Sequence, residues 1–312
     1  MQALPGKRIV LLSVSLVLSA CGGGGGGGGT VPAGTPVPTF TRWSDVLPGS
    51  TVQVHGLGQQ VTGTTSASGE QFIANDPSPV TDGYSAVLTF DSARKLTGVA
   101  LTTPATLVKF DGAEFADLAL SPGKFVGATS STSVAIMAKA IELDWEYQTF
   151  GVWQTGLNTT SQTFGAMSVG NSAGTAIPGS GTATFTGHVA GTYVNPNGLG
   201  YTALGTLNVV ANFAGNSLAF TGTTNTLHPN QITTPVVPNI DFLNFTGTAN
   251  YNPSINSFTV PLTTTGNYNN TGTLAGSTTG QFYGPNAEEL GGVFFLKGSG
   301  SETYAGAYGA KQ

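Results

Sequence analysis

A serine and the histidines around it are the first residues in this chain that could do chemistry. Residues 170–174 read Gly-Asn-Ser-Ala-Gly, the G-x-S-x-G pattern of a hydrolase nucleophile. That nucleophile needs a strand before it, a helix after it, and then an acid followed by a histidine. After Ser172 come His188, His228 and then Asp241, and no histidine follows the acid. The order of these residues argues against a catalytic triad.

Carboxylates form the second group of chemical candidates. Glu288 and Glu289 are adjacent, so their side chains diverge and cannot flank one scissile bond. In Ala140–Gln148 three acidic residues alternate with apolar ones, which predicts a half-buried strand with a solvated face. A cation site would need a bent chain that brings the oxygens together. The three histidines lack the spacing of metal ligands. We expect no enzyme, no metal and no cofactor.

The composition favours β structure. Of 312 residues 46 are glycine, only 8% are charged, and the net charge is −5. Helical bundles need long charged side chains on their exposed faces, whereas strands with tight turns need threonine and glycine. Ten basic residues in an acidic chain do not supply the basic patch of a nucleic-acid-binding surface. We expect an all-β protein that does not bind nucleic acid.

The N-terminus predicts export and lipidation. Lys7 and Arg8 precede the apolar run Ile9–Leu18, which is too short to span a bilayer comfortably. The only cysteine, Cys21, follows Leu-Ser-Ala, a string similar to the lipobox of bacterial lipoproteins. We predict a signal peptide over residues 1–20 and acyl chains on Cys21 that hold the protein on a membrane. A plain secretory peptide is the alternative. A lone cysteine allows no disulfide within the chain.

Residues 21–41 predict a tether. Gly22–Gly29 is unbroken glycine, and Thr30–Phe40 is rich in proline and glycine. A phosphate-binding loop would need a strand before the glycines and a helix after them, and the flanking sequence predicts neither. A coil of this kind would hold the folded part about 25 Å from its anchor.

Residues 42–150 predict a smaller, mostly β domain, and 151–178 a connecting segment. Short alternating runs such as Ala86–Phe90 and Leu96–Leu101 are typical of strands. Asp117–Ala140 is the one place where a short helix is plausible.

Residues 179–312 predict an eight-stranded antiparallel up-and-down barrel. Small and bulky residues share one face of the first segment, as the interior of a small barrel requires. Closure removes sheet edges that a chain with few lysines could not protect. A transmembrane barrel is the alternative, but the segments lack an apolar outer band with aromatic girdles. The segments are Thr182–Tyr193, Ala203–Phe213, Ser217–Thr224, Leu243–Tyr251, Asn256–Leu262, Asn270–Tyr283, Gly291–Lys297 and Thr303–Gly309.

From Asp144 onward the chain resembles the β-barrel domain of transferrin-binding protein B and related surface lipoproteins. That family has two lobes, each a handle domain followed by a barrel, whereas this chain has length for one lobe. The matching strings are YQTFGVW (147–153), GTATFTGHVAGTY (181–193), FYGPNAEELGGVF (282–294) and GAYGAK (306–311).

The string over 282–294 predicts a structural corner of the barrel. Pro285 ends a strand at Gly284, and the residues after it can make one helical turn. Gly291 and Gly292 allow close backbone approach where the chain re-enters the sheet. The resemblance implies that Glu289 is a buried or capping carboxylate satisfied by backbone N–H groups.

The resemblance also implies a function. It points to a monomeric, lipid-anchored protein of the outer membrane that faces the cell surface, with the periplasmic face as the alternative. Its ligand would be a protein that carries iron or haem, and an outer-membrane receptor is a further candidate partner. A barrel that binds haem or another small ligand, and an adhesin or structural envelope lipoprotein, are the alternatives. Loop tips commonly carry recognition, and the candidate contacts are Asn195 and Asn197 in Asn195–Gly200, and His228 and Asn230 in Leu227–Asn239.

Overall fold

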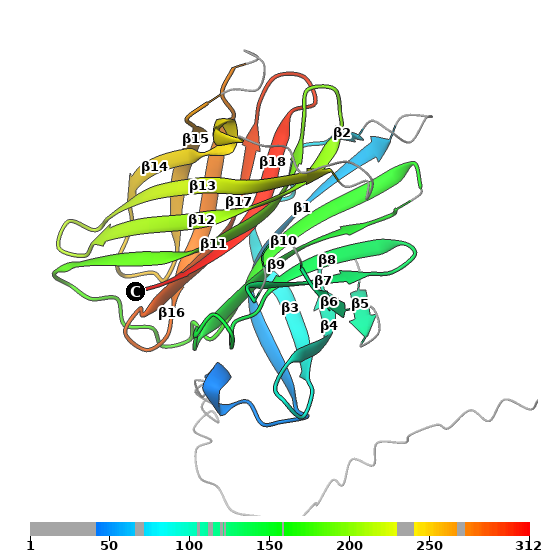
Figure 1. Ribbon diagram of the computed structural model, residues 1–312. Coiled ribbons are helices and arrows are strands. Elements are labelled where there is room, and N and C mark those ends of the chain that lie inside the picture. The colour runs from blue at the N-terminus through cyan, green and yellow to red at the C-terminus, as the bar shows by residue number, and fades with distance from the viewer. Residues whose placement is uncertain are drawn as a thin grey trace, which may run out of the picture. The chain divides into compact units, whose positions relative to one another are not determined.

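Two β-sheets make up the part of the chain that the computed structural model describes (Figure 1). The described residues are 42–65, 72–104, 107–111, 115–118, 121, 123–157, 159–229, 240–266 and 272–312. The helical elements in these ranges are two short 3-10 turns, η1 (Trp43–Asp45) and η3 (Asp241–Leu243). No helix in the same ranges is long and apolar enough to cross a membrane. The predicted signal peptide, Cys21 and the tether lie outside the described residues.

The N-terminal sheet has ten antiparallel strands, and the first strand of the chain lies in its middle. The order is β5-β4-β3-β1-β10-β9-β8-β7-β6, and β2 pairs with β1 off this path. β1 pairs with β10 from His55↔Gly170 to Thr64↔Ser161, so the two ends of this region meet at its centre. The strands are β1 (Thr51–Thr65), β2 (Phe72–Ala74), β3 (Thr81–Phe90), β4 (Leu96–Thr102), β5 (Leu107–Asp111), β6 (Phe115–Asp117), β7 (Phe125–Thr129), β8 (Ser133–Ala138), β9 (Gln148–Thr155) and β10 (Ser161–Gly170).

This sheet extends beyond the domain expected over residues 42–150. The expected connecting segment, 151–178, contains most of β9 and all of β10, which pairs with β1 on one side and β9 on the other. Every residue from 148 to 154 is buried, so β9 shows no alternation of apolar and polar residues. The stretch that joins the two sheets is 171–181.

The prediction of a strand over Ala140–Gln148 is wrong, because only Gln148 belongs to a strand, and residues 140–147 form the turn between β8 and β9. Its backbone bonds locally: the N–H of Trp145 donates to the carbonyl of Ala140 at 2.9 Å, and Asp144 has a left-handed φ of 57°. The alternation of apolar and acidic residues reflects a turn with one buried side. The helix considered over Asp117–Ala140 is also wrong, because β7 and β8 form a hairpin there.

The C-terminal sheet closes into an eight-stranded antiparallel barrel, as the sequence predicted. Each strand pairs with the next, and β18 pairs with β11 from Thr186↔Lys311 to Val194↔Thr303. In Figure 1 the barrel runs from green β11 to red β18. The all-β fold class and all eight strands are confirmed. The strands are β11 (Thr182–Val194), β12 (Gly200–Asn212), β13 (Ser217–Pro229), β14 (Phe245–Asn250), β15 (Phe258–Thr264), β16 (Ala275–Tyr283), β17 (Glu289–Lys297) and β18 (Thr303–Lys311).

Aromatic side chains fill the interior of the barrel. The ring of Phe282 lies 6.0 Å from that of Phe185 and 5.5 Å from that of Phe258, between ring centroids. Phe220 packs edge-on against Tyr308 at 5.7 Å. Full burial of such a side chain stabilises the fold by about 1.5–3 kcal/mol. The barrel therefore has a packed core of its own.

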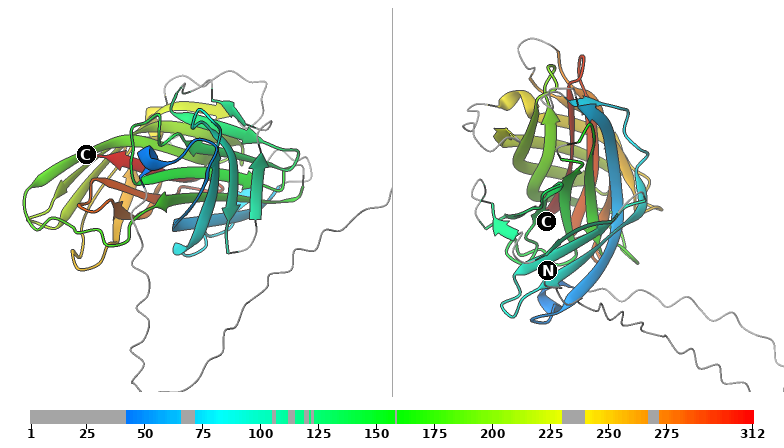
Figure 2. Two further views of the ribbon diagram at one scale, coloured as in Figure 1. Left: turned by 90° about the horizontal axis from the view of Figure 1, so that it is seen from below. Right: turned by 90° about the vertical axis from the view of Figure 1, so that its right-hand side faces the viewer.

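The two sheets pack against each other. β9 and β10 lie against β17 and β18 (Figures 1 and 2). Ala190, Val293 and Ala307 belong to the barrel, yet they are 0% exposed and pack with the core of the N-terminal sheet. The hydroxyl of Tyr283 donates to the carbonyl of Ser168 at 3.0 Å across this junction. Outward-facing barrel residues are therefore buried by the first sheet.

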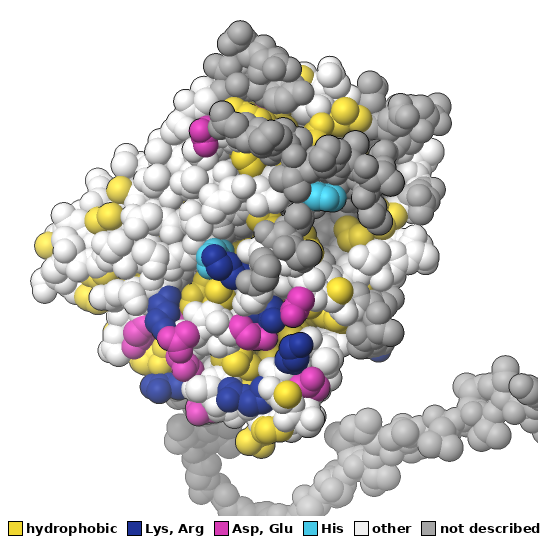
Figure 3. Space-filling model, viewed as in Figure 1, with side chains coloured by type: hydrophobic (Ala, Val, Ile, Leu, Met, Phe, Trp, Pro, Cys, Tyr) yellow, Lys and Arg dark blue, Asp and Glu magenta, His cyan; other side chains and the backbone are white. Residues whose placement is uncertain are grey.

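Charged side chains are divided unequally between the sheets. From Tyr147 to Ala287 the chain has one formally charged residue, Asp241. In the face shown in Figure 3, basic and acidic side chains gather in the lower part of the view, and the surface at the left, over the barrel strands, is almost free of them. The outer wall of the barrel is built mainly from threonine, asparagine, serine and glycine.

Candidate functional site

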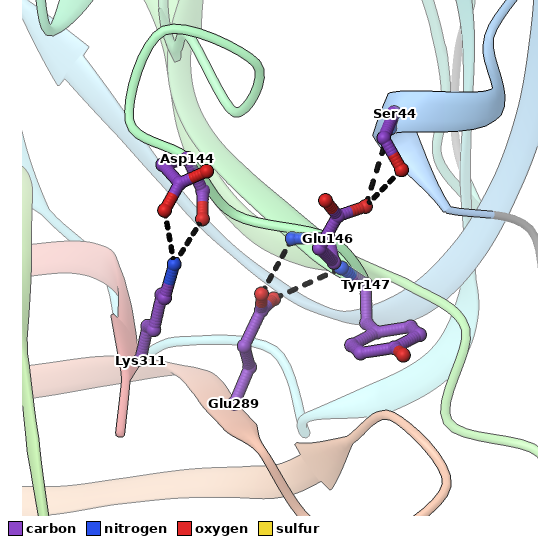
Figure 4. Close-up of polar contacts among 6 residues, drawn as sticks. All are labelled: Ser44, Asp144, Glu146, Tyr147, Glu289 and Lys311. Carbon is purple, nitrogen blue, oxygen red and sulfur yellow. Dashed lines mark hydrogen bonds and ion pairs between the residues drawn. The ribbon is translucent and has the colours of Figure 1, made fainter.

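The GPNAEEL interruption forms a tight corner between β16 and β17. The corner begins at Gly284, with a φ of 84°, and Ala287 has a φ of 60°. Pro285 and Asn286 form a turn, so the single helical turn expected there does not form. Gly284 suits its position because glycine adopts a positive φ at low cost. β17 then starts at Glu289, which the corner directs toward the N-terminal sheet (Figure 4).

The carboxylate of Glu289 joins the two sheets. It accepts hydrogen bonds from the backbone N–H groups of Glu146 at 2.5 Å and Tyr147 at 3.1 Å (Figure 4), and from that of Gln148 at 3.0 Å. Glu289 is 1% exposed. The role implied by the resemblance, a buried carboxylate satisfied by backbone N–H groups, therefore agrees with its contacts. Its partners lie at the end of the turn before β9 and at the first residue of β9, and sequence reasoning did not identify them.

Burial is the main influence on the ionisation of Glu289. It raises the pKa of this carboxyl to about 7, against the lowering effect of the three N–H donors and of the Lys311 charge. Lys311 itself bonds the carboxylate of Asp144 at 2.5 Å and the carbonyl of the same residue at 2.6 Å. Glu146 turns its side chain away and accepts from the hydroxyl of Ser44 at 2.7 Å (Figure 4). Charged groups here hold the turn in place.

Gly291 and Gly292 are required by close packing. A Cβ on Gly291 would lie 2.4 Å from the hydroxyl oxygen of Ser168 on β10. A Cβ on Gly292 would lie 2.5 Å from the carbonyl oxygen of Thr279 and 2.6 Å from the hydroxyl oxygen of Tyr308. Such distances do not occur in real side chains, so both positions need glycine. The structure accounts for both glycines of the motif.

Glu288 and Glu289 do not form a catalytic pair. Glu288 accepts from the backbone N–H of Asn286 at 2.9 Å and from its side-chain amide at 2.8 Å, within the corner. Glu289 faces the other sheet. The two carboxylates therefore serve separate local structures.

The other chemical candidates are also separated. Ser172 follows the end of β10, and its carbonyl accepts from the side chain of Asn256 at 3.3 Å. His55, His188 and His228 lie on β1, β11 and β13. Among the described residues no group of three His, Cys, Asp or Glu side chains could hold a metal ion.

The β11–β12 turn carries two of the residues predicted to contact a ligand. Asn195 is 1% exposed, and its side-chain oxygen accepts from the N–H groups of Asn197 at 2.9 Å and Leu199 at 3.0 Å. Asn195 therefore shapes the turn from inside. Asn197 is exposed, as a contact residue must be, and Leu199 beside it is 40% exposed.

This turn rests on the N-terminal sheet. The N–H of Phe72 on β2 donates to the carbonyl of Gly198 at 2.8 Å, and Phe72 packs edge-on against Phe164 at 4.7 Å. The next residue of β2, Ile73, is 56% exposed. We call the surface formed by Ile73, Asn197 and Leu199 the loop end. Sequence reasoning missed Ile73. The one signal for this residue in the sequence was the apolar pair Phe72-Ile73, shortly after a stretch that contains serine and glycine.

His228 lies at the same end of the barrel as this turn. Near the end of β13 it pairs with Thr202, and Pro229 pairs with Tyr201, shortly after the turn. His228 is partly buried. Asn230 and the rest of 230–239 lie outside the described residues. Asn197 and His228 are thus brought to one end of the barrel, while Cys21 and Asn230 stay predictions.

Comparison with known proteins supports the resemblance of the barrel. Residues 177–312 match a family model described as the C-lobe and N-lobe beta barrels of Tf-binding protein B. The match includes every strand from β11 to β18. A comparison with curated protein sequences finds no match. The resemblance seen in the sequence is thereby confirmed for this domain.

Several solved structures are similar to this chain at low sequence identity. Transferrin-binding protein B from Actinobacillus pleuropneumoniae is 16% identical, with a TM-score of 0.45 over 82% of this chain and 99% of that one. The isotype 1 protein from serogroup B Neisseria meningitidis is 12% identical, with a TM-score of 0.42 over 85% and 77%. A protein described as a surface lipoprotein is 15% identical, with a TM-score of 0.43 over 81% and 98%.

Proposed function

We propose that this chain is a lipid-anchored envelope protein that captures a protein ligand at the outer membrane. Its C-terminal domain is similar to the barrels of transferrin-binding protein B. The loop end is the observation that carries this proposal. Both sheets contribute to it, and it presents the exposed apolar side chains of Ile73 and Leu199 beside the polar Asn197. Apolar side chains exposed together on a rigid frame are typical of protein-binding surfaces.

The proposed ligand is an iron- or haem-carrying protein. The matched family is named for binding transferrin. Transferrin carries iron, so we extend this class of ligand to the present chain. The exposed residues of the loop end suit a protein surface, because they offer apolar contact area with few charges. The interior of the barrel is filled by aromatic side chains such as Phe282 and Tyr308, which favours binding by the outer surface over enclosure of a small ligand.

The proposed anchor is the acylated Cys21. The tether over 21–41 would connect it to the N-terminal sheet, which the barrel follows in the chain. An anchor and a tether of about 25 Å would let the folded part meet a large partner away from the membrane. We propose a monomer that faces the cell surface and can hand its ligand to an outer-membrane receptor.

Binding measurements on the full chain in detergent would test the loop end. Transferrin, haemoglobin and an unrelated control protein are passed over the immobilised chain. The double variant Ile73→Ser and Leu199→Ser should weaken binding of the true ligand at least about tenfold. Leu47→Ser is the matched control, because Leu47 is 71% exposed and lies outside the loop end.

Two results would contradict the proposal. One is a ligand bound equally well by wild type and the double variant while both show the same melting curve. The other is rapid turnover of a hydrolase substrate by the purified chain.

A further inference from the structure

A hollow of about 590 Å³ opens on the outer wall of the barrel, away from the loop end. Its floor is formed by the middle of β11, β12 and β13, and its wall by the turn between β8 and β9 and the end of β18. The side chains of Thr186, Thr206, Asn208, Thr221 and Thr223 form its floor.

The floor is a regular array of polar side chains. Strand register places Thr186, Asn208 and Thr221 in one row across the three strands. His188 shares the next row with Thr206 and Thr223. Neighbouring strands are about 4.8 Å apart, so the rows present hydroxyl and amide groups at close intervals.

The floor side chains are available to a ligand. None of the hydroxyl and amide groups of these four threonines and one asparagine bonds another residue in the part of the chain that the structure describes. Elsewhere cross-strand threonines bond each other, as Thr259 and Thr279 do at 3.3 Å. Thr206 and Thr223 also face each other across strands, but without such a bond. Their donors and acceptors point into the hollow instead of being used by the fold.

Lys311, the lysine that lines the hollow, is paired with Asp144. The ring of His188 lies 6.0 Å from Phe125 and 6.4 Å from Trp145, and it hydrogen-bonds the backbone of Gly205.

Burial, with a smaller effect of the Lys124 charge, lowers the pKa of His188, which keeps the ring neutral at neutral pH. Leu143, which is partly exposed, adds an apolar wall beside the polar floor, and Trp145 next to it is 4% exposed.

We infer that this hollow binds a neutral oligosaccharide. Ring hydroxyls can pair with the threonine and asparagine groups of the floor, and the C–H faces of a sugar can pack on the apolar wall. An anionic ligand would need unpaired cations, and a haem would need a mostly apolar slot. The uncharged barrel wall around the hollow suits a neutral ligand too. This site is separate from the loop end and does not depend on the function proposed for it.

Titrations of the full chain in detergent would test the site. The probes are maltohexaose, cellohexaose and chitohexaose, with a heparin-derived hexasaccharide and haemin as charged alternatives, followed by saturation-transfer NMR. We expect saturable binding of at least one neutral probe at micromolar to millimolar concentration. Thr206→Val and Thr223→Val should each weaken it about tenfold or more, because each removes a hydroxyl and keeps a β-branched shape.

Thr259→Val is the matched control, because Thr259 lies on the outer wall of β15 outside the hollow, and it should bind like wild type. Thr223 is exposed, so its variant decides the result if Thr206→Val lowers the melting temperature. The inference fails if only the charged probes bind, if no neutral probe binds at millimolar concentration, or if the Thr223→Val variant binds as wild type does.

Discussion

Both sheets are antiparallel, but only the C-terminal sheet closes into a barrel. In the barrel every strand pairs with its neighbour in sequence, and only the β11–β18 pair joins distant segments. In the N-terminal sheet β1 lies at the centre, and β5 and β6 form the two edges. Hairpins between consecutive strands follow from local patterns. A central first strand needs the whole region to have been made before its last partner, β10, can pair with it.

The open and the closed sheet also differ in where their charged residues lie. The open sheet has charged residues on its edge strands, such as Lys109 on β5 and Asp117 on β6. The closed barrel has no edges, and its strands from β11 to β16 contain no Asp, Glu, Lys or Arg. Charges at sheet edges hinder pairing with other chains. Closure makes that protection unnecessary, which explains how a wall rich in threonine and glycine can stay free of charge.

Removal of residues 303–312 should have the largest effect, because it would open the closed barrel and remove its difference from the N-terminal sheet. β18 pairs with both β11 and β17, so its loss opens the barrel and exposes two strand edges. We expect the cooperative thermal transition, followed by circular dichroism, to disappear. Removal of Gln312 alone should leave it in place. A truncated chain with an unchanged melting curve would show that closure is not needed.

Gly292→Val should destabilise the barrel next most strongly. The new Cβ would meet the backbone of Thr279 at 2.5 Å, where no flexible side chain can move aside. We expect the free energy of unfolding in urea to fall by about 3 kcal/mol. Gly179→Val is the control, because a Cβ there has no atom within 4 Å and the expected change is within about 0.5 kcal/mol. Equal effects at both positions would refute the packing argument.

The stability that the junction between the sheets gives the protein should depend on pH, because Glu289 lies in this junction. Its pKa is raised from 4.5 to about 7 in the folded protein. Between these values the folded state holds a proton that the unfolded chain has released. The contribution of Glu289 to stability is therefore larger at the acid side and decreases as the pH rises toward 7, by on the order of 2 kcal/mol.

Urea unfolding at pH 5 and pH 8 would measure this effect. The difference between the two free energies of unfolding should shift by about 2 kcal/mol in Glu289→Gln, relative to wild type. Glu288→Gln, a change to the neighbouring, partly exposed carboxylate, should keep the wild-type difference. Identical pH dependence in wild type and Glu289→Gln would exclude this role.

The smallest effect is expected at the ion pair between the sheets. Lys297 and Asp76 lie 3.0 Å apart, and their side chains are 49% and 86% exposed. Exposed pairs contribute little, because water screens them, so Lys297→Met should change the free energy of unfolding by less than about 0.5 kcal/mol. A loss well above this value, in the same urea assay, would mean that the pair helps to hold the two sheets together.

Local patterns in the sequence determined most of the barrel. Alternation and turn residues located all eight strands, and Pro285, Gly291 and Gly292 identified the corner at which β17 begins. Resemblance to a known family added the buried role of Glu289. These features could be predicted because each depends on residues that are close in sequence, or on a string that the family shares.

Only the tertiary structure decided which distant segments meet. The partners of Glu289 lie more than 140 residues before it, and eight strands separate β1 from β10 in the sequence. The turn over 140–147 has the same alternation of apolar and acidic residues as a strand, so this alternation alone could not distinguish the two. The loop end and the threonine-lined hollow also combine segments from both sheets, and no local pattern in the sequence records such contacts.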